Sequence, residues 1–189
     1  MSRWSLVLAG LLGLASMQAR ATDPLSVMSF NIRLPAESDG VDYWETRKPL
    51  AVRMLREQQP DVIGLQELVK AQADYLAREL PQYAWFGRGR EADGGGEHMG
   101  VFYRKDRLTV IESGDFWLSD TPDVAGSITW GHPHPRMVTW ALFEQRSDGR
   151  RFYLFNTHLP YRDEDEAARL QPHHLVDAGA GQRRAGAGV

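Results

Sequence analysis

The sequence predicts a layered α/β domain whose strands form mixed sheets, and three observations point to this class. Two early segments carry apolar residues at helical spacing. Several short runs instead alternate apolar and polar residues, as half-buried strands do. Two of the later strand-like runs are separated only by the turn-forming residues Ser147, Asp148 and Gly149. Helices early and strand hairpins late favour helices packed on mixed sheets over a purely parallel sheet.

Strands and helices alternate in the first half of the chain. Residues 25–32 predict a strand, because large apolar side chains stand at every second position from Met28 to Ile32. Thr46 can cap a helix whose first turn tolerates Pro49. The expected apolar stripe of this helix comprises Leu50, Met54 and Leu55. A short buried strand at 61–66 and a second helix at 69–80 complete this half, and Pro81 ends the helical pattern.

The second half is expected to consist of strands and loops. Residues 88–97 contain three consecutive glycines and predict a mobile loop. The expected strands lie at 83–86, 99–103, 108–118, 137–143 and 152–159.

Composition limits the class of protein. The chain has 189 residues, 42% of them hydrophobic, which is enough for one domain with a core. It has no Cys, which excludes disulfides and thiolate metal sites. The formal net charge is −3. This charge does not favour binding of a long polyanion such as duplex DNA.

The two ends of the chain depart from the pattern of the domain, which we assign to residues 22–171. Residues 1–21 combine a basic Arg3, an apolar run too short to cross a bilayer and a small-x-small triplet. They predict a signal peptide and an exported protein, periplasmic or secreted, without a transmembrane segment. Residues 172–189 are rich in Gly, Ala and Arg without periodicity, so we expect a disordered tail. A shifted reading frame in a GC-rich gene is our hypothesis for the origin of this tail.

Three strand-like runs end in polar residues that a core strand rarely holds. Asn31 closes the first run and Glu67 follows the second. Asn156 and His158 share one face at the end of the last run. Converging strand ends form the usual mouth of an α/β active site, so we expect these side chains to lie close together.

These residue types suit a magnesium site that acts on phosphate. Mg²⁺ commonly takes one or two protein carboxylates together with water and substrate phosphate, a role that fits Glu67. Asn31 could hold a metal-bound water, and His158 could protonate a leaving oxygen or orient a water. Each residue also has an ordinary structural interpretation: a solvated acid, a turn-forming amide and a structural imidazole. His132 and His134 form an H-x-H pair, but the spacing places no third zinc ligand.

Six ordered segments resemble the endonuclease/exonuclease/phosphatase family, in its bacterial exported branch. The resemblance covers about residues 25–170. The segments are SFNIR at 29–33, LQE at 65–67, GEHMGVFYR at 96–104, FWLS at 116–119, PR at 135–136 and FNTHL at 155–159.

The resemblance implies the N-terminal part of a four-layer α/β sandwich with mixed sheets and outer helices. It also implies Mg²⁺ or Mn²⁺ and hydrolysis of a phosphoester by in-line attack of water. Glu67 would then be the metal ligand, and the catalytic residues would be His158, Asn31 and Asn156. The expected substrate-binding residues are Arg136, Glu97 and His98. Arg136 equally suits a surface residue that steadies a loop, and residues 88–98 equally suit a plain connection.

Two motifs that complete the site in this family do not follow His158. They are strand ends resembling Gly-Asp-Phe-Asn and Ser-Asp-His. We therefore expect impaired activity, and an exposed apolar face with poor solubility. The substrate would be a sugar phosphate, a phospholipid headgroup or a nucleic acid, and no stable protein partner is expected. The alternatives are an inactive fragment or phosphoester-binding remnant, and a surface-binding module unrelated to phosphate.

Overall fold

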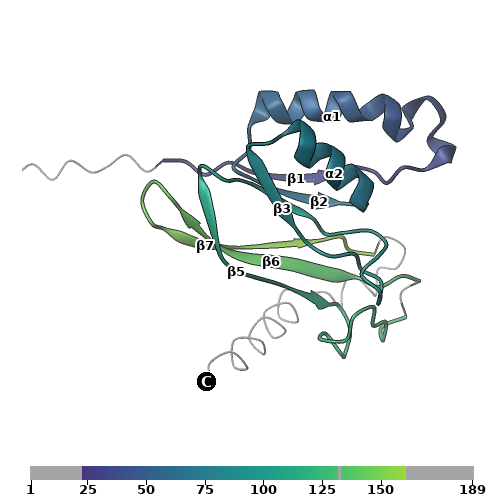
Figure 1. The fold of residues 1–189 in the computed structure, drawn as a ribbon. Coiled ribbons are helices and arrows are strands. Elements are labelled where there is room, and N and C mark those ends of the chain that lie inside the picture. Colours follow the sequence, from purple (N-terminus) through teal and green to yellow (C-terminus); the bar gives the residue numbers. More distant parts are fainter. Residues whose placement is uncertain (1–22, 132, 161–189) are drawn as a thin grey trace, which may run out of the picture.

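The computed structural model describes residues 23–131 and 133–160 (Figure 1). Two sheets pack face to face, and both helices lie on the outer face of the first sheet. The expected α/β sandwich is therefore confirmed, with three layers in the described part of the chain. The predicted signal peptide at 1–21, the tail at 172–189 and His132 lie outside the described residues. Neither described helix has the length and apolarity needed to cross a membrane.

The first sheet is mixed and has the strand order β1-β2-β4-β3. β1 and β2 are parallel, whereas β4 runs antiparallel to both β2 and β3. β2 is buried on both faces, because Ile63 and Leu65 pack under the helices while Val62 packs against the second sheet. The strands are β1 (Val27–Asn31), β2 (Val62–Gln66), β3 (Tyr83–Phe86) and β4 (Val101–Arg104).

The second sheet is an antiparallel meander in the order β5-β6-β7. Its inner face contributes Leu108, Ala141 and Phe143 to the core between the sheets. The turn at 147–149 joins β6 to β7 as expected, and Gly149 supplies the positive φ of 74° that the turn requires. The strands are β5 (Leu108–Trp117), β6 (Met137–Gln145) and β7 (Arg151–Thr157).

The first helix begins earlier than the sequence predicts. A short 3-10 segment η1 (Glu37–Asp42) leads into α1 (Trp44–Gln58), and α2 is Lys70–Glu79. Trp44 is buried and packs edge-on against Tyr75 of α2, with ring centroids 5.9 Å apart, so the helix includes Trp44 and the expected cap at Thr46 is wrong. The buried face shifts accordingly, because Leu50 is 52% exposed whereas Ala51 and Val52 are buried.

The glycine-rich segment at 88–97 is a loop, as predicted, but it is held in place. Within the loop, main-chain hydrogen bonds join Gly89 to Gly94 and Arg90 to Glu97. The Trp117 indole also donates to the Arg90 carbonyl at 2.8 Å. These contacts replace the mobile connection that the sequence led us to expect.

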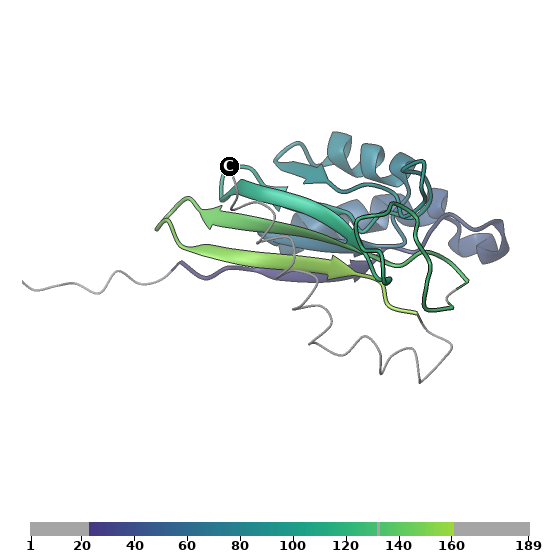
Figure 2. The same ribbon diagram turned by 90° about the horizontal axis from the view of Figure 1, so that it is seen from below.

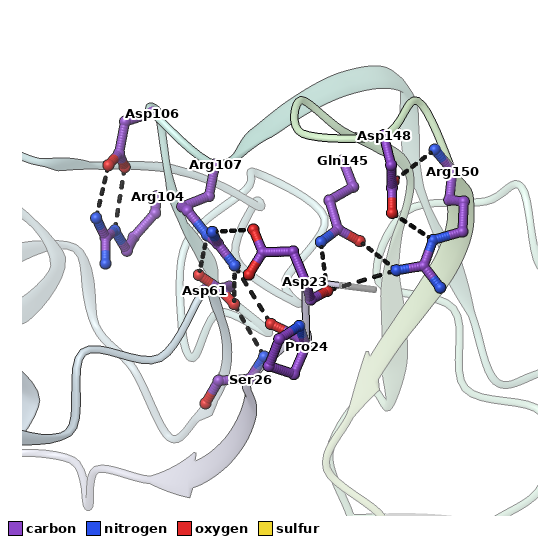
Figure 3. Close-up of polar contacts among 10 residues, drawn as sticks. All are labelled: Asp23, Pro24, Ser26, Asp61, Arg104, Asp106, Arg107, Gln145, Asp148 and Arg150. Carbon is purple, nitrogen blue, oxygen red and sulfur yellow. Dashed lines mark hydrogen bonds and ion pairs between the residues drawn. The ribbon is translucent and has the colours of Figure 1, made fainter. Parts of the chain in front are cut away.

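An ion-pair cluster closes the end of the sandwich where β1 and β2 begin (Figure 3). Arg107 binds both Asp23 and Asp61, and its Nε lies 2.9 Å from Asp61 Oδ1. The hydrogen bond from Arg107 is the main reason that the pKa of the exposed Asp23 carboxyl lies below its ordinary value. Arg150 and Gln145 bind the Asp23 carbonyl from the second sheet. This cluster ties both sheets to the start of the domain, at the end opposite the polar strand ends.

Candidate active site

The polar strand ends lie at one end of the sandwich, as predicted. β1 and β2 are parallel, with Asn31 opposite Gln66. β7 runs in the same direction as β1 in both views, so its C-terminal residues lie at that end too (Figures 1 and 2). His158 follows Asn156 by two positions and lies just beyond the end of β7 at Thr157.

Glu67 and Asn31 form the first part of the site. Asn31 Nδ2 donates to Glu67 Oε1 at 2.9 Å, and the Leu34 amide donates to Oε2 at 3.2 Å. Arg33 Nη1 lies 3.6 Å from the same Oε2. Glu67 has a φ of 57°, a left-handed conformation that costs a non-glycine residue about 1–2 kcal/mol. Residues held in such conformations cluster at functional sites, which supports a role for this carboxylate.

The surroundings of Glu67 keep its carboxyl ionised. Burial is the largest single influence and raises the pKa of Glu67. Hydrogen bonds from Asn31 and the Leu34 amide outweigh it, with help from the charges of His158 and Arg33, so the pKa lies below its ordinary value. The charge of His158 acts on the Glu67 carboxyl, so the imidazole lies within electrostatic range of this carboxylate.

His158 faces the partly buried acid Glu97. Its Nδ1 is 3.8 Å from Glu97 Oε2, which is too long for a hydrogen bond. Arg90 Nη1 lies 3.0 Å from the same oxygen, and the Arg90 side chain is only 10% exposed. The predicted substrate-binding residue Glu97 therefore lies between Arg90 and His158.

Asn156 differs from the other strand-end residues because its side chain is buried and fully bonded. It accepts a hydrogen bond from Gln66 Nε2 at 2.7 Å. Its Nδ2 donates to the carbonyls of Leu65 and Gly100 at 2.9 and 3.0 Å. A Cβ at Gly64 would lie 2.7 Å from Asn156 Oδ1, so only glycine leaves room for this amide. Asn156 thus connects β7 to Leu65 and Gln66, the two residues that precede Glu67.

The two other expected substrate residues are buried. His98 is 6% exposed, its Nδ1 lies 3.0 Å from the Gly96 carbonyl, and its amide donates to the Leu68 carbonyl at 2.7 Å. Burial lowers the pKa of His98, and the bonds to Gly96 and Leu68 only partly offset this effect. Arg136 is 4% exposed, so the alternative of a surface arginine is wrong.

The sequence did not single out Arg33 or Arg90. Arg33 could have been noticed, because it ends the SFNIR segment and follows Asn31 by two residues. No motif in the sequence points to Arg90, because it meets Glu97 only when the loop folds.

A divalent cation fits this site in part. Glu67 offers a hard carboxylate whose two oxygens each keep a further lone pair after the hydrogen bonds described above. Oxygen donors are what Mg²⁺ and Mn²⁺ prefer. The described part of the chain contains no group of three or more His, Cys, Asp or Glu that could hold a metal ion. Glu67, held by Asn31 and the Leu34 amide, is the acidic ligand that the geometry offers for such an ion.

The described residues thus combine a layered α/β fold with an acid, an amide and an imidazole at or just beyond the ends of strands. The chain belongs to the endonuclease/exonuclease/phosphatase family, whose model matches residues 28–187.

Solved structures of this family are similar over most of the chain. A mannosyl-6-phosphatase from Bacteroides thetaiotaomicron is 35% identical with a TM-score of 0.75, and the match covers 84% of this chain and 61% of that one. A family protein from Bacteroides vulgatus is 31% identical with a TM-score of 0.71, over 77% and 55% of the two chains.

Among curated proteins, an uncharacterized protein of Acanthamoeba polyphaga mimivirus is 28% identical over 125 residues, or 61% of this chain and 46% of its own length. The chain thus spans about half of that relative, and less than two thirds of either structure.

Proposed function

We propose that this protein is a metal-dependent hydrolase of phosphoesters that uses in-line attack of water. The observation that carries the proposal is the Asn31–Glu67 hydrogen bond of 2.9 Å, in a site that also contains His158. Family membership supports the reaction class. The mannosyl-6-phosphatase suggests a small phosphate ester as substrate, and the net negative charge agrees with this choice over duplex DNA.

In this proposal each polar residue has a distinct task. Asn31 and the Leu34 amide hold the Glu67 carboxylate in the orientation needed to bind Mg²⁺ or Mn²⁺. The bound cation would neutralise charge on the phosphoryl oxygens. His158 donates a hydrogen bond to a phosphoryl oxygen, and Glu97 orients the imidazole through Nδ1. Asn156 does not contact the substrate but positions His158 relative to Glu67.

The remaining predicted substrate residues support the site in different ways. His98 fixes the loop that carries Glu97, through its bonds to Leu68 and Gly96. Arg136 is proposed as a phosphate contact, because a guanidinium matches phosphate oxygens bidentately. Residues 1–21 would direct the protein out of the cytoplasm.

The test is hydrolysis of the monoester p-nitrophenyl phosphate and of the diester bis-p-nitrophenyl phosphate, each with and without Mg²⁺. We expect Glu67→Ala and His158→Ala to lower the rate by a factor on the order of 10² to 10⁴. The matched control is Glu57→Ala, since this side chain is exposed and lies in the last turns of α1. Equal rates in Glu67→Ala and Glu57→Ala would reject the assignment of the metal ligand.

A phosphoester-binding remnant without catalysis is the second candidate. It is favoured because the described residues contain no group of three or more His, Cys, Asp or Glu that could hold a metal ion. Titration with inorganic phosphate in the presence of Mg²⁺ separates the two candidates. Binding that requires Glu67 and His158, together with no hydrolysis above that of the variants, would favour the remnant.

A further inference from the structure

The loop between β1 and α1 borders a hollow that shares the residue Arg33 with the surroundings of Glu67. The hollow has a volume of about 280 Å³ and is lined by Arg33, Asp39, Asp42 and Arg47. Arg33 also belongs to the site, because its Nη1 lies 3.6 Å from Glu67 Oε2. A volume just below the roughly 300 Å³ at which ligand pockets begin suits a small group attached to the phosphate.

The walls of the hollow are fixed before any ligand binds. Arg47 donates to the carbonyls of Ile32 at 2.7 Å, Asp42 at 2.5 Å and Arg33 at 3.2 Å. Arg33 donates twice to Asp39, at 2.8 and 3.2 Å. Arg33 also has a left-handed φ of 61°, so its direction is set by this network rather than by backbone preference. A preformed wall lowers the entropic cost of binding a ligand.

The charges of the lining select the chemistry of the ligand. Two guanidinium groups and two carboxylates balance each other, so a second phosphate gains little net attraction. An apolar group would take these charges out of water without replacing their hydrogen bonds. Hydroxyl groups satisfy both kinds of wall, because each can donate to a carboxylate and accept from a guanidinium. The Asp42 carboxylate is the best placed acceptor, since it is exposed and no hydrogen bond or ion pair from the described residues engages it.

We infer that this hollow binds the hydroxyl-rich leaving group of a phosphate monoester, such as a sugar, while the phosphate lies between Glu67 and His158. The inference rests on the proposed function, because it takes the position of the phosphate from it. Arg33 and Asp39 then form the wall nearest the phosphate, and Asp42 binds hydroxyls farther along the leaving group.

The test compares two monoesters that share the phosphate and differ in the leaving group. Dissociation constants of glucose 6-phosphate and ethyl phosphate are measured by NMR titration with Mg²⁺ present, and ³¹P spectra verify that both esters stay intact. We expect the wild type to bind glucose 6-phosphate about tenfold more tightly, since hydrogen bonds to a charged group are worth about that factor or more. Asp42→Asn keeps the side-chain shape and should reduce this preference to about twofold or less. Glu37→Gln, an exposed acid of the same 3-10 segment, is the matched control and should retain the preference.

The outcomes separate the inference from the function on which it rests. Equal affinity of the wild type for the two esters, or equal preferences in Asp42→Asn and Glu37→Gln, overturns the hydroxyl site while leaving the phosphate site intact. Absence of binding for both esters overturns the phosphate site and the inference with it.

Discussion

Asn156 connects the strand that leads to His158 with the sheet that leads to Glu67. Its three hydrogen bonds cross from β7 to β2 and β4, so the position of β7 relative to the first sheet depends on one carboxamide. Thr139 and Asp115 stand beside it on β6 and β5 in the same row of the second sheet. A row of polar residues thus crosses the second sheet at Asn156, two positions before His158. Single substitutions in this row test how the sheet positions the active-site residues.

We predict that Asn156→Ala loses about 1–3 kcal/mol of stability, because Gln66 and the buried carbonyls of Leu65 and Gly100 each lose one hydrogen bond. The pKa of the Glu67 carboxyl should rise toward its ordinary value, since His158 moves away from it. Thermal unfolding and ¹³C NMR titration of Glu67 measure the two effects. Tyr83→Phe is the control, because it removes the buried 2.6 Å bond to the Pro60 carbonyl far from the site. If both variants left the Glu67 titration unchanged, Asn156 would be structural only.

Asp115 provides a prediction about pH. Burial raises the pKa of this carboxyl, and the hydrogen bond from Thr139 with the charges of Arg88 and His98 opposes burial only in part. The folded pKa then lies above the unfolded value, so the wild type loses stability as pH rises through the folded pKa. Asp115→Asn should therefore raise the melting temperature at pH 7, with a smaller gain near pH 4. Asp74→Asn, on the exposed side of α2, should show no such trend. A gain that is larger at pH 4 than at pH 7 would contradict the role of burial.

At the scale of elements, the loop at residues 87–98 determines the position of Glu97. Its main chain is bonded internally and to Leu68, and Trp117 fixes the Arg90 carbonyl. Gly89 sits where the two arms of the loop meet, and a Cβ there would lie 1.9 Å from the Gly95 carbonyl oxygen. Close approach of backbone to backbone, rather than flexibility, explains this glycine.

We predict that Gly89→Ala disrupts the loop and costs about 1–3 kcal/mol, the usual range for overpacking. Glu97 should then separate from His158, and phosphate binding should weaken. Thermal melts and phosphate titration measure both effects. Gly131→Ala is the control, since a Cβ there meets nothing within 4 Å although the position has a positive φ of 83°, so this variant carries backbone strain without a packing clash. An equal loss of phosphate binding in the two variants would show that loop packing at Gly89 does not set the position of Glu97.

The elements could be predicted because they depend on local spacing, whereas the roles of individual residues depend on the fold. Strand 83–86 and the turn at 147–149 follow from alternation and turn chemistry, and the structure reproduces both. The start of α1 could not be predicted, since it is set by the packing of Trp44 against a residue of α2. Asn156 and His158 look equivalent in the sequence, because both are polar and share a strand face. Only the opposite sheet distinguishes the buried, bonded amide from the half-buried imidazole.

At the scale of the whole molecule, the described residues cover one face of the second sheet and leave the other exposed. The inner face packs against the first sheet, whereas the outer face presents the aromatic residues Trp140, Tyr153 and Phe155. Tyr153 and Phe155 are 44% and 54% exposed, and no helix among the described residues covers them. β7 is also an edge strand in the described sheet. An exposed aromatic strip beside an unpaired edge favours association between copies of the chain.

We predict that the wild type self-associates at micromolar concentration and that Phe155→Lys shifts it toward the monomer, because a charge on an edge strand opposes pairing. The melting temperature should change little, since more than half of the Phe155 side chain is exposed. Analytical ultracentrifugation over a concentration series measures the association. Val41→Lys is the control, because Val41 is 84% exposed and lies in η1, which belongs to neither sheet. A wild type that stays monomeric throughout the series, or an equal response to both lysines, would show that the aromatic strip does not drive association.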